Sequence, residues 1–199
     1  MDTVLRFGPT ERVLHWLCAG LFFAMLVTGF VMGRRGGLVH QVLYTSHLAF
    51  GGLLVAGVAL IVWRGDRRRL GADARQVGRF DQLDRRWLRS APEHLLGLAP
   101  EPPAGRFNAG QKLNTGLTTF VILPGLLLTG LLAVLLGHHS LAAELHKLAI
   151  IAACVLVGGH LYMALLNPRT RPSASGMVSG RVDRAWASEH HPRWDPDDA

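Results

Sequence analysis

Four long stretches of apolar residues distinguish this chain from the sequence of a soluble domain. The chain has 199 residues and a mean hydropathy of +0.24, and its apolar residues are gathered into runs. A helix rises about 1.5 Å per residue and the hydrocarbon of a bilayer is about 30 Å thick, so each run is long enough to cross it. The runs are residues 13–32, 41–63, 113–136 and 141–166.

These runs predict an all-α fold, a four-transmembrane-helix bundle that makes up a single membrane domain over residues 1–199. Thr10 and Ser140 precede the first and fourth runs and are expected to be N-caps. Pro124 lies inside the third run and predicts a kink, which a membrane bundle tolerates.

The positive charge gathers on one side of the predicted bundle. The loop over residues 64–112 carries eleven Lys and Arg and the tail over 167–199 carries five, whereas the opposite side holds Arg34, Arg35 and Lys147. The positive-inside rule therefore predicts that both termini and the long loop are cytoplasmic, in a bacterial inner membrane. The net charge of +7 comes without zinc-finger spacing or basic strips interleaved with aromatics, so nucleic-acid binding is not expected.

Within the long loop, four apolar residues fall at helical spacing and predict a short interfacial helix. They are Phe80, Leu83, Trp87 and Leu88. The proline-rich residues 99–105 that follow are expected to form a linker.

Four histidines fall inside or at the ends of the spans: His15, His47, His146 and His160. Taken singly, each is as readily a polar partner for another group in the membrane. The predicted topology sorts them into an outer pair, His47 with His146, and an inner pair, His15 with His160. Six-coordinate haem needs two imidazoles on opposite faces, so the pairs predict two b-type haems whose irons these histidines bind.

The spacing on the fourth span supports this interpretation. His146 and His160 are 14 residues apart, which returns them to within about 40° of one helix face, separated by about 21 Å along the axis. One haem near each leaflet fits that separation. The chain has no Cys-x-x-Cys-His motif, so the haems would be held by their iron ligands alone.

Several segments resemble the gamma subunit of membrane-bound formate dehydrogenase, a dihaem cytochrome b related to those of nickel–iron hydrogenases. They are Glu11–Arg12 to His15–Trp16, Thr28–Gly29, the run GRFNAGQK over 105–112, Thr129–Gly130, HLYMA over 160–164, and the tail over 176–194 that contains HHPRW. The run and the HHPRW tail are specific to the formate dehydrogenase branch.

The resemblance implies the same two pairs of haem ligands as the depth argument. It also implies a quinone site at the cytoplasmic end, made by Asn108, Gly110 and Gln111 with the inner ligand His160 adjoining. Amide groups can donate to quinone carbonyls, and glycine allows close approach of the backbone. From the sequence alone, Asn108 is more readily an N-cap of the third span, and the two roles are compatible.

The resemblance further implies two partners, an iron–sulfur subunit and a molybdenum- or tungsten-containing catalytic subunit that oxidises formate. This chain would be the anchor, the electron path and the quinone reductase, with electrons entering at the outer haem from the periplasmic side. Three alternatives stay open: a hydrogenase or other oxidoreductase as the donor, a metal or proton transporter lined by the histidines, and a purely structural anchor. The last leaves the matched histidine depths unexplained.

Overall fold

The structure is a computed structural model that describes residues 2–95, 98–137 and 139–195. It contains four helices that are long and apolar enough to cross a membrane, Pro9–Met32, Gly37–Arg64, Ala109–Leu136 and Leu141–Leu166. These helices confirm the four predicted spans, and the first three begin four residues before the apolar runs do. The chain forms two compact units, which we call the N-terminal unit (Phe7–Gly71) and the C-terminal unit (the remainder).

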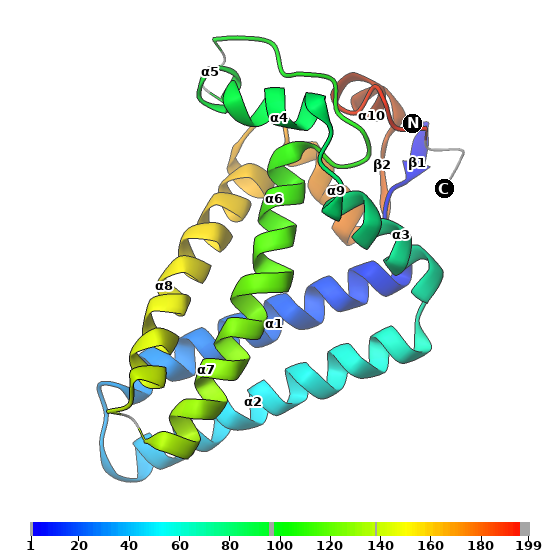
Figure 1. The fold of residues 1–199 in the computed structure, drawn as a ribbon. Helices are drawn as coiled ribbons and strands as arrows, with labels where there is room; N and C mark the ends of the chain where they lie inside the picture. The colour runs from blue at the N-terminus through cyan, green and yellow to red at the C-terminus, as the bar shows by residue number, and fades with distance from the viewer. Residues whose placement is uncertain (1, 96–97, 138, 196–199) are drawn as a thin grey trace. The chain divides into compact units, whose positions relative to one another are not determined.

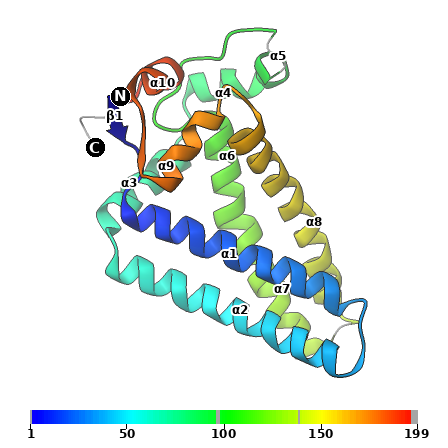
Figure 2. The ribbon, with the colours of Figure 1, turned by 180° about the vertical axis from the view of Figure 1, so that it is seen from behind.

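The N-terminal unit is a hairpin of α1 (Pro9–Met32) and α2 (Gly37–Arg64), which lie side by side (Figure 1 and Figure 2). An ion pair joins its open end, because Glu11 is only 8% exposed and its carboxylate lies 2.6 Å from Arg69 Nε. The pair ties the start of α1 to the segment that follows α2.

The start of α1 differs from the expectation that Thr10 is its N-cap. Gly8 is the N-cap, and Pro9 takes the first helical position, where its fixed φ suits the helix and its missing N–H is no loss. Thr10 instead accepts a hydrogen bond from the backbone N–H of Asp66 at 3.1 Å. The hydroxyl therefore joins the two ends of the hairpin instead of capping a helix.

The C-terminal unit holds the other two spans. The third is built from α6 (Ala109–Leu117), the π-helix η1 (Thr118–Ile122) and α7 (Leu123–Leu136), and the fourth from α8 (Leu141–Leu161) and the π-helix η2 (Tyr162–Leu166). The π-helix η1 ends just before Pro124, which cannot donate to the preceding turn and crowds its carbonyl. The kink expected at Pro124 stays a prediction. Ser140 caps α8 as predicted, accepting from Ala143 N–H at 3.3 Å.

The four spans present large apolar side chains to their surroundings. Leu135 is 69% exposed and Val155 is 71% exposed, and many leucines and valines along the spans resemble them. Apolar surface of this extent is unfavourable in water and favourable in hydrocarbon. The exposed apolar surface of the spans therefore fits helices that cross a bilayer.

The rest of the C-terminal unit forms a polar cap, by which we mean residues 2–6, 72–108 and 167–195 in the described part of the chain. Its short helices are α4 (Gln82–Arg89), α5 (Ala91–Leu95), the 3-10 helix η3 (Arg171–Ser173), α9 (Ala174–Val178) and α10 (Arg184–His190), and α3 (Arg67–Gly78) leads into it from the other unit. The short helix predicted around Trp87 is α4, and residues 100–105 have no regular structure, as expected of a linker.

The cap also contains a strand pair that the all-α prediction did not include. Strand β1 (Thr3–Leu5) runs antiparallel to β2 (Arg181–Asp183), with Val4 opposite Val182. Both valines are buried, beside Ala187 and against Trp186 and Trp194. Strands of three residues are too short to leave a periodic signal in the sequence. The pair joins the N-terminal segment to the tail.

A buried arginine lies at the centre of the cap. Arg6 is 1% exposed, and its guanidinium lies 5.4 Å from the ring centre of Trp186 and 5.5 Å from that of Trp194. It donates to the carbonyl of Arg106 at 2.9 Å, and Arg106 donates back to the carbonyl of Arg6 at 2.7 Å. Burial, followed by the charge of Arg106, lowers the pKa of Arg6 to about 9, so the side chain stays charged at neutral pH.

Arg106 also forms an ion pair with Asp73 at 2.6 Å, and both side chains are largely buried. We expect Arg106→Gln to lower the free energy of unfolding of the cap by about 3 kcal/mol, because the buried Asp73 would lose its counter-charge. Arg193→Gln is the matched control, since Arg193 pairs with Asp81 at a half-exposed site and should contribute under about 1 kcal/mol.

The measurement is tryptophan fluorescence during thermal unfolding in detergent, with limited proteolysis of the N-terminal segment alongside. Equal shifts for Arg106→Gln and Arg193→Gln would show that the buried ion pair does not hold the cap together.

Candidate functional site

In the N-terminal unit, His47 of α2 is held by α1 through one ring nitrogen. Its Nδ1 lies 3.0 Å from the carbonyl oxygen of Met25 and 3.1 Å from Thr28 Oγ1. The Thr28 hydroxyl itself donates to the carbonyl of Ala24 at 2.8 Å, so its oxygen is an acceptor for the imidazole. A carbonyl can only accept, so Nδ1 carries the ring proton and the lone pair lies on Nε2.

The C-terminal unit repeats this arrangement at His146 of α8. Its Nδ1 lies 3.0 Å from the carbonyl oxygen of Leu126 and 3.2 Å from Thr129 Oγ1, both in α7. The Thr129 hydroxyl donates to the carbonyl of Gly125 at 2.6 Å. The tautomer is therefore the same as that of His47, with the lone pair on Nε2.

A glycine follows each of these threonines and makes room for the ring. A Cβ added to Gly29 would lie 3.3 Å from His47 Cε1, and one added to Gly130 would lie 3.2 Å from His146 Cε1. Both distances are tighter than ordinary contacts. The two Thr-Gly pairs therefore have one local role, in which threonine accepts from the histidine and glycine lets the imidazole lie against the helix.

The other two predicted ligands lie at a second level of each unit. On α1, His15 precedes Thr28 by 13 residues, and on α8, His146 precedes His160 by 14 residues. At about 1.5 Å per residue, each unit carries its two levels about 20 Å apart. The His15 ring packs edge-on against Trp16 at 5.2 Å, and His160 is exposed near the end of α8.

These histidines have the chemistry that haem iron requires. An axial imidazole binds through one nitrogen while the other is fixed by a hydrogen bond, and both His47 and His146 have that bond in place. Glycines also lie beside the ligand positions. Among the described residues, no side chain beyond the immediate chain neighbours lies within 4 Å of a Cβ built on Gly52, Gly158 or Gly159, so a flat macrocycle could approach the backbone there.

The residues predicted for quinone form one turn at the start of α6. Asn108 is the N-cap of α6, where its side-chain oxygen accepts from Gln111 N–H at 2.8 Å and Gln111 Oε1 accepts from Asn108 N–H at 3.0 Å. This capping box uses the oxygen of both amides. The Asn108 amide nitrogen donates to Glu101 at 3.2 Å, and that of Gln111 has no hydrogen-bond partner among the described residues.

Gly110 in this turn lies against an aromatic ring. A Cβ at Gly110 would come within 2.6 Å of the Trp87 ring, so any side chain there would displace the indole. Trp87 is 8% exposed and its indole Nε1 donates to Glu101 Oε1 at 2.6 Å. Glu101 thus accepts from both Trp87 and Asn108, and it joins α4 to the Asn108–Gln111 turn.

The neighbours of the turn anchor it to the cap. Lys112 forms an ion pair with Asp84 of α4 at 2.7 Å. His191 Nδ1 donates to the carbonyl of Gly105 at 2.7 Å, and Arg193 N–H donates to the carbonyl of Ala104 at 3.0 Å. The GRFNAGQK run and the HHPRW tail therefore contact each other directly.

The contact leaves His191 in an apolar setting that disfavours its charged form. Burial, and then the nearby Arg6 charge, lower the pKa of His191 to about 3. The ring is therefore neutral at physiological pH, as a donor to a carbonyl next to a buried arginine should be.

The structure brings some predicted residues together and leaves other relations as predictions. Asn108, Gly110 and Gln111 share one turn, and α8, which carries His160, ends at the end of the C-terminal unit where α6 begins (Figure 1). Each predicted haem pair takes one histidine from each unit, so the pairing stays a prediction.

Sequence reasoning missed the roles of four residues. Thr28 and Thr129 accept from the histidines, and Trp87 and Glu101 contact the Asn108–Gln111 turn. The repeated Thr-Gly pair, at matching places in the first and third spans, was the available signal for the threonines.

Comparison with known proteins identifies relatives along nearly the whole chain. A family described as prokaryotic cytochrome b561 matches residues 6–180. The formate dehydrogenase cytochrome b556(fdo) subunit of Escherichia coli K12 is 28% identical over 210 residues, covering 97% of this chain and 92% of that protein. The cytochrome b556 subunit of formate dehydrogenase from Haemophilus influenzae is 27% identical, covering 96% and 82%.

A nitrate-inducible formate dehydrogenase cytochrome b556(Fdn) subunit of Escherichia coli K12 is 31% identical over 125 residues, covering 57% of this chain and 55% of that protein. The family match covers most of the chain and includes the Thr-Gly pairs and all four histidines. This chain belongs to the prokaryotic cytochrome b561 family.

Proposed function

We propose that this chain is the cytochrome b subunit of a membrane-bound formate dehydrogenase, which anchors the complex and passes electrons through two b haems to quinone. The observation that carries the proposal is the matched pair His47 and His146. In each, the Nδ1–H donates to a carbonyl and a threonine oxygen of the neighbouring helix. The relatives, which are formate dehydrogenase subunits by name, favour formate as the source of electrons.

The chain's own residues assign the two haem sites. His47 and His146 would hold the outer haem, with Thr28 and Thr129 fixing the ring planes, and His15 and His160 would hold the inner haem. The similar separation of levels, 13 residues on α1 and 14 on α8, supports two haems stacked about 20 Å apart between leaflets. When bound, the haem irons supply the one-electron chemistry that carries electrons from the periplasmic side to the cytoplasmic side.

The quinone site in this proposal is the turn from Asn108 to Gln111, next to the inner ligand His160. The Gln111 amide nitrogen is the donor that the capping box leaves for a quinone carbonyl, and Gly110 lets the Trp87 ring lie directly against the turn. Asn108 has a supporting role, since its oxygen and nitrogen hold Gln111 and Glu101.

Orientation and partners follow from the same proposal. The pairing of β1 with β2 joins the N-terminal segment to the tail, which supports placing both termini on one side of the membrane. The basic loop and tail make that side the cytoplasm of a bacterial inner membrane. An iron–sulfur subunit and a molybdenum- or tungsten-containing catalytic subunit would supply the electrons, because this chain has only two cysteines and both are free.

The ligand assignment predicts that His47→Ala and His146→Ala each remove the same haem. A haem with one imidazole lost is no longer held, so the pyridine haemochrome count should fall from two haems to one per chain. His40→Ala is the control, since that ring lies in the first turn of α2 and bonds to the carbonyl of Met32 at the end of α1. If His47→Ala and His146→Ala removed different haems, the pairing would be wrong.

The threonines predict a change of potential without loss of haem. Thr129→Val keeps the side-chain shape and removes an acceptor of the His146 Nδ1 proton, which makes the imidazole a weaker donor to iron. We expect the midpoint potential of the outer haem to rise by up to about 40 mV. A hydrogen bond contributes about 1 kcal/mol, and a one-electron couple shifts by about 59 mV per tenfold change in equilibrium constant.

Redox titration of the visible spectrum measures this shift. Thr28→Val should raise the midpoint potential of the same haem. Thr119→Val, on the same span as Thr129, should leave the midpoint potentials of both haems unchanged. Shifts of two different haems by Thr28→Val and Thr129→Val would place His47 and His146 in separate sites.

The quinone turn predicts a loss of quinone reduction with both haems intact. Gln111→Ala should slow it about tenfold, which is the effect of losing one hydrogen bond of about 1.4 kcal/mol. Gln111→Glu is the sharper test, because it keeps the Oε1 acceptor of the capping box and removes the amide donor. Asn114→Ala, one turn along α6, is the control.

Reoxidation of the reduced haems by added quinone is the measurement. Unchanged quinone kinetics and inhibitor affinity in both Gln111 variants would move the quinone site elsewhere on the chain.

A further inference from the structure

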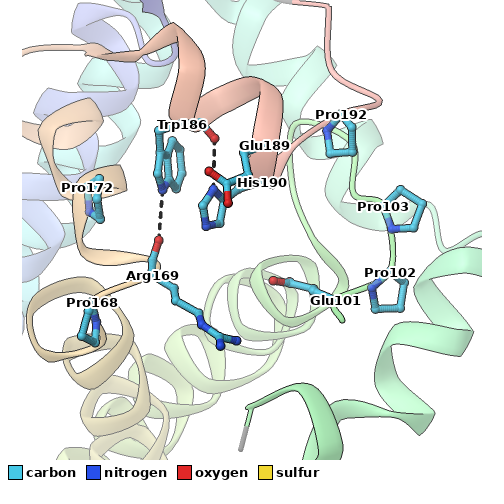
Figure 3. Close-up of a pocket in the computed structure, with 10 residues that line it drawn as sticks. All are labelled: Glu101, Pro102, Pro103, Pro168, Arg169, Pro172, Trp186, Glu189, His190 and Pro192. Carbon is cyan, nitrogen blue, oxygen red and sulfur yellow. Dashed lines mark hydrogen bonds between the residues drawn. The ribbon is translucent and has the colours of Figure 1, made fainter. Parts of the chain in front are cut away.

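A cavity of about 600 Å³ lies in the cap, between the linker that precedes α6 and two parts of the tail, residues 168–172 and 186–192. Glu101 and Pro102 line one side, and Arg169, Trp186, Glu189 and His190 line the other. Figure 3 shows the Glu101 side chain extending into this space opposite the tail residues. All of these residues belong to the C-terminal unit, and the space is large enough for many water molecules.

Glu101 connects the cavity to the proposed quinone turn. One of its oxygens accepts from Trp87 Nε1 at 2.6 Å and from Asn108 Nδ2 at 3.2 Å, while the residue lines the cavity. Trp87 fills the space beside Gly110, so both partners of the carboxylate belong to the turn or touch it. A carboxylate that faces water on one side and the turn on the other is placed to carry protons between them.

The turn itself has no group that can give up a proton. Asn108, Gly110 and Gln111 do not titrate, and the next residue, Lys112, is committed to a largely buried ion pair with Asp84 at 2.7 Å. The ionisable groups that face Glu101 lie across the cavity and are Arg169, Glu189 and His190. His190 is held by a hydrogen bond between its Nδ1 and the Trp186 carbonyl at 3.1 Å, so its position in the cavity wall is fixed.

We propose that Glu101 delivers protons from this cavity to quinone held at the Asn108–Gln111 turn, an assignment that rests on the proposed quinone site. Conversion of one quinone to quinol takes two electrons and two protons. The inner haem, when bound, would supply the electrons, and each proton passes from the Glu101 carboxyl to a quinone oxygen, directly or through one water. Water in the cavity, with Glu189 and His190 beside it, reprotonates Glu101.

The test uses the full chain with its haems, in detergent. The haems are reduced with dithionite and then mixed with decylubiquinone or, separately, with menadione, while their absorbance reports electron transfer. Glu101→Gln keeps an oxygen acceptor for Trp87 and Asn108 but cannot carry a proton. We expect it to slow haem reoxidation by a factor on the order of 100 and to abolish its dependence on pH, while Glu101→Asp recovers part of the rate.

Two controls separate proton transfer from a structural role. Glu144→Gln changes an exposed carboxylate in the first turn of α8, at the end of that helix away from His160, and should leave the rate unchanged. Trp87→Phe removes the indole hydrogen bond but keeps the carboxylate, and it should preserve the pH dependence.

Binding supplies a readout that does not depend on turnover. Titration with heptyl-hydroxyquinoline N-oxide should give the Glu101→Gln variant the wild-type affinity, because the substitution keeps the acceptor for Trp87 and Asn108 and removes only the carboxyl proton. Wild-type reoxidation rates in Glu101→Gln would overturn the proton assignment and leave the quinone site standing. If neither quinone reoxidised the wild-type haems, the proposed function would instead be overturned.

Discussion

The position of one proton on His47 and of one on His146 governs how these histidines could bind haem iron. Hydrocarbon offers no water to satisfy an imidazole N–H, so the proton must be donated to a group on a neighbouring helix. His47 and His146 both donate to a main-chain carbonyl and a threonine one helix away, which fixes the ring and leaves the lone pair on Nε2. An α-helical carbonyl is already an acceptor within its helix, and the glycine after each threonine lets the ring come near enough to share it.

The same device occurs in two helical hairpins whose other features differ. In the C-terminal unit, the π-helix η1 precedes Pro124 and α7, whereas α1 and α2 of the N-terminal unit are continuous α-helices. Despite this, Met25 and Leu126 each lie three residues before the threonine, and in each hairpin the carbonyl and the threonine accept from the same histidine Nδ1–H. The geometry therefore depends on a short local pattern, a carbonyl, threonine and glycine on one helix facing a histidine on the next.

The sequence predicted the spans closely because the bilayer imposes length and apolarity on them. It predicted Asn108 as a cap for a similar reason, since capping is a local property. It could not predict the polar cap of the C-terminal unit. There Arg6 bonds to Arg106, 100 residues away, and a three-residue strand near the N-terminus pairs with one in the tail. Such contacts depend on non-local packing, and neither composition nor periodicity records them. Thr10 failed as a cap because Pro9 pre-empted the helix start.

The motifs shared with the formate dehydrogenase branch acquire a physical meaning from these contacts. The GRFNAGQK run is held on both sides, by His191 at Gly105 and by Asp84 at Lys112, so that the turn between them is anchored at two points. These two contacts keep the Gln111 donor in place. Gly110 has no side chain, which leaves room for the Trp87 ring against the same turn. Trp87 in turn orients Glu101, which means that the groups proposed to bind quinone and to protonate it are positioned by one network. On these proposals, proton supply and quinone binding would be coupled by the fold, and a change that loosens the cap should disturb both together.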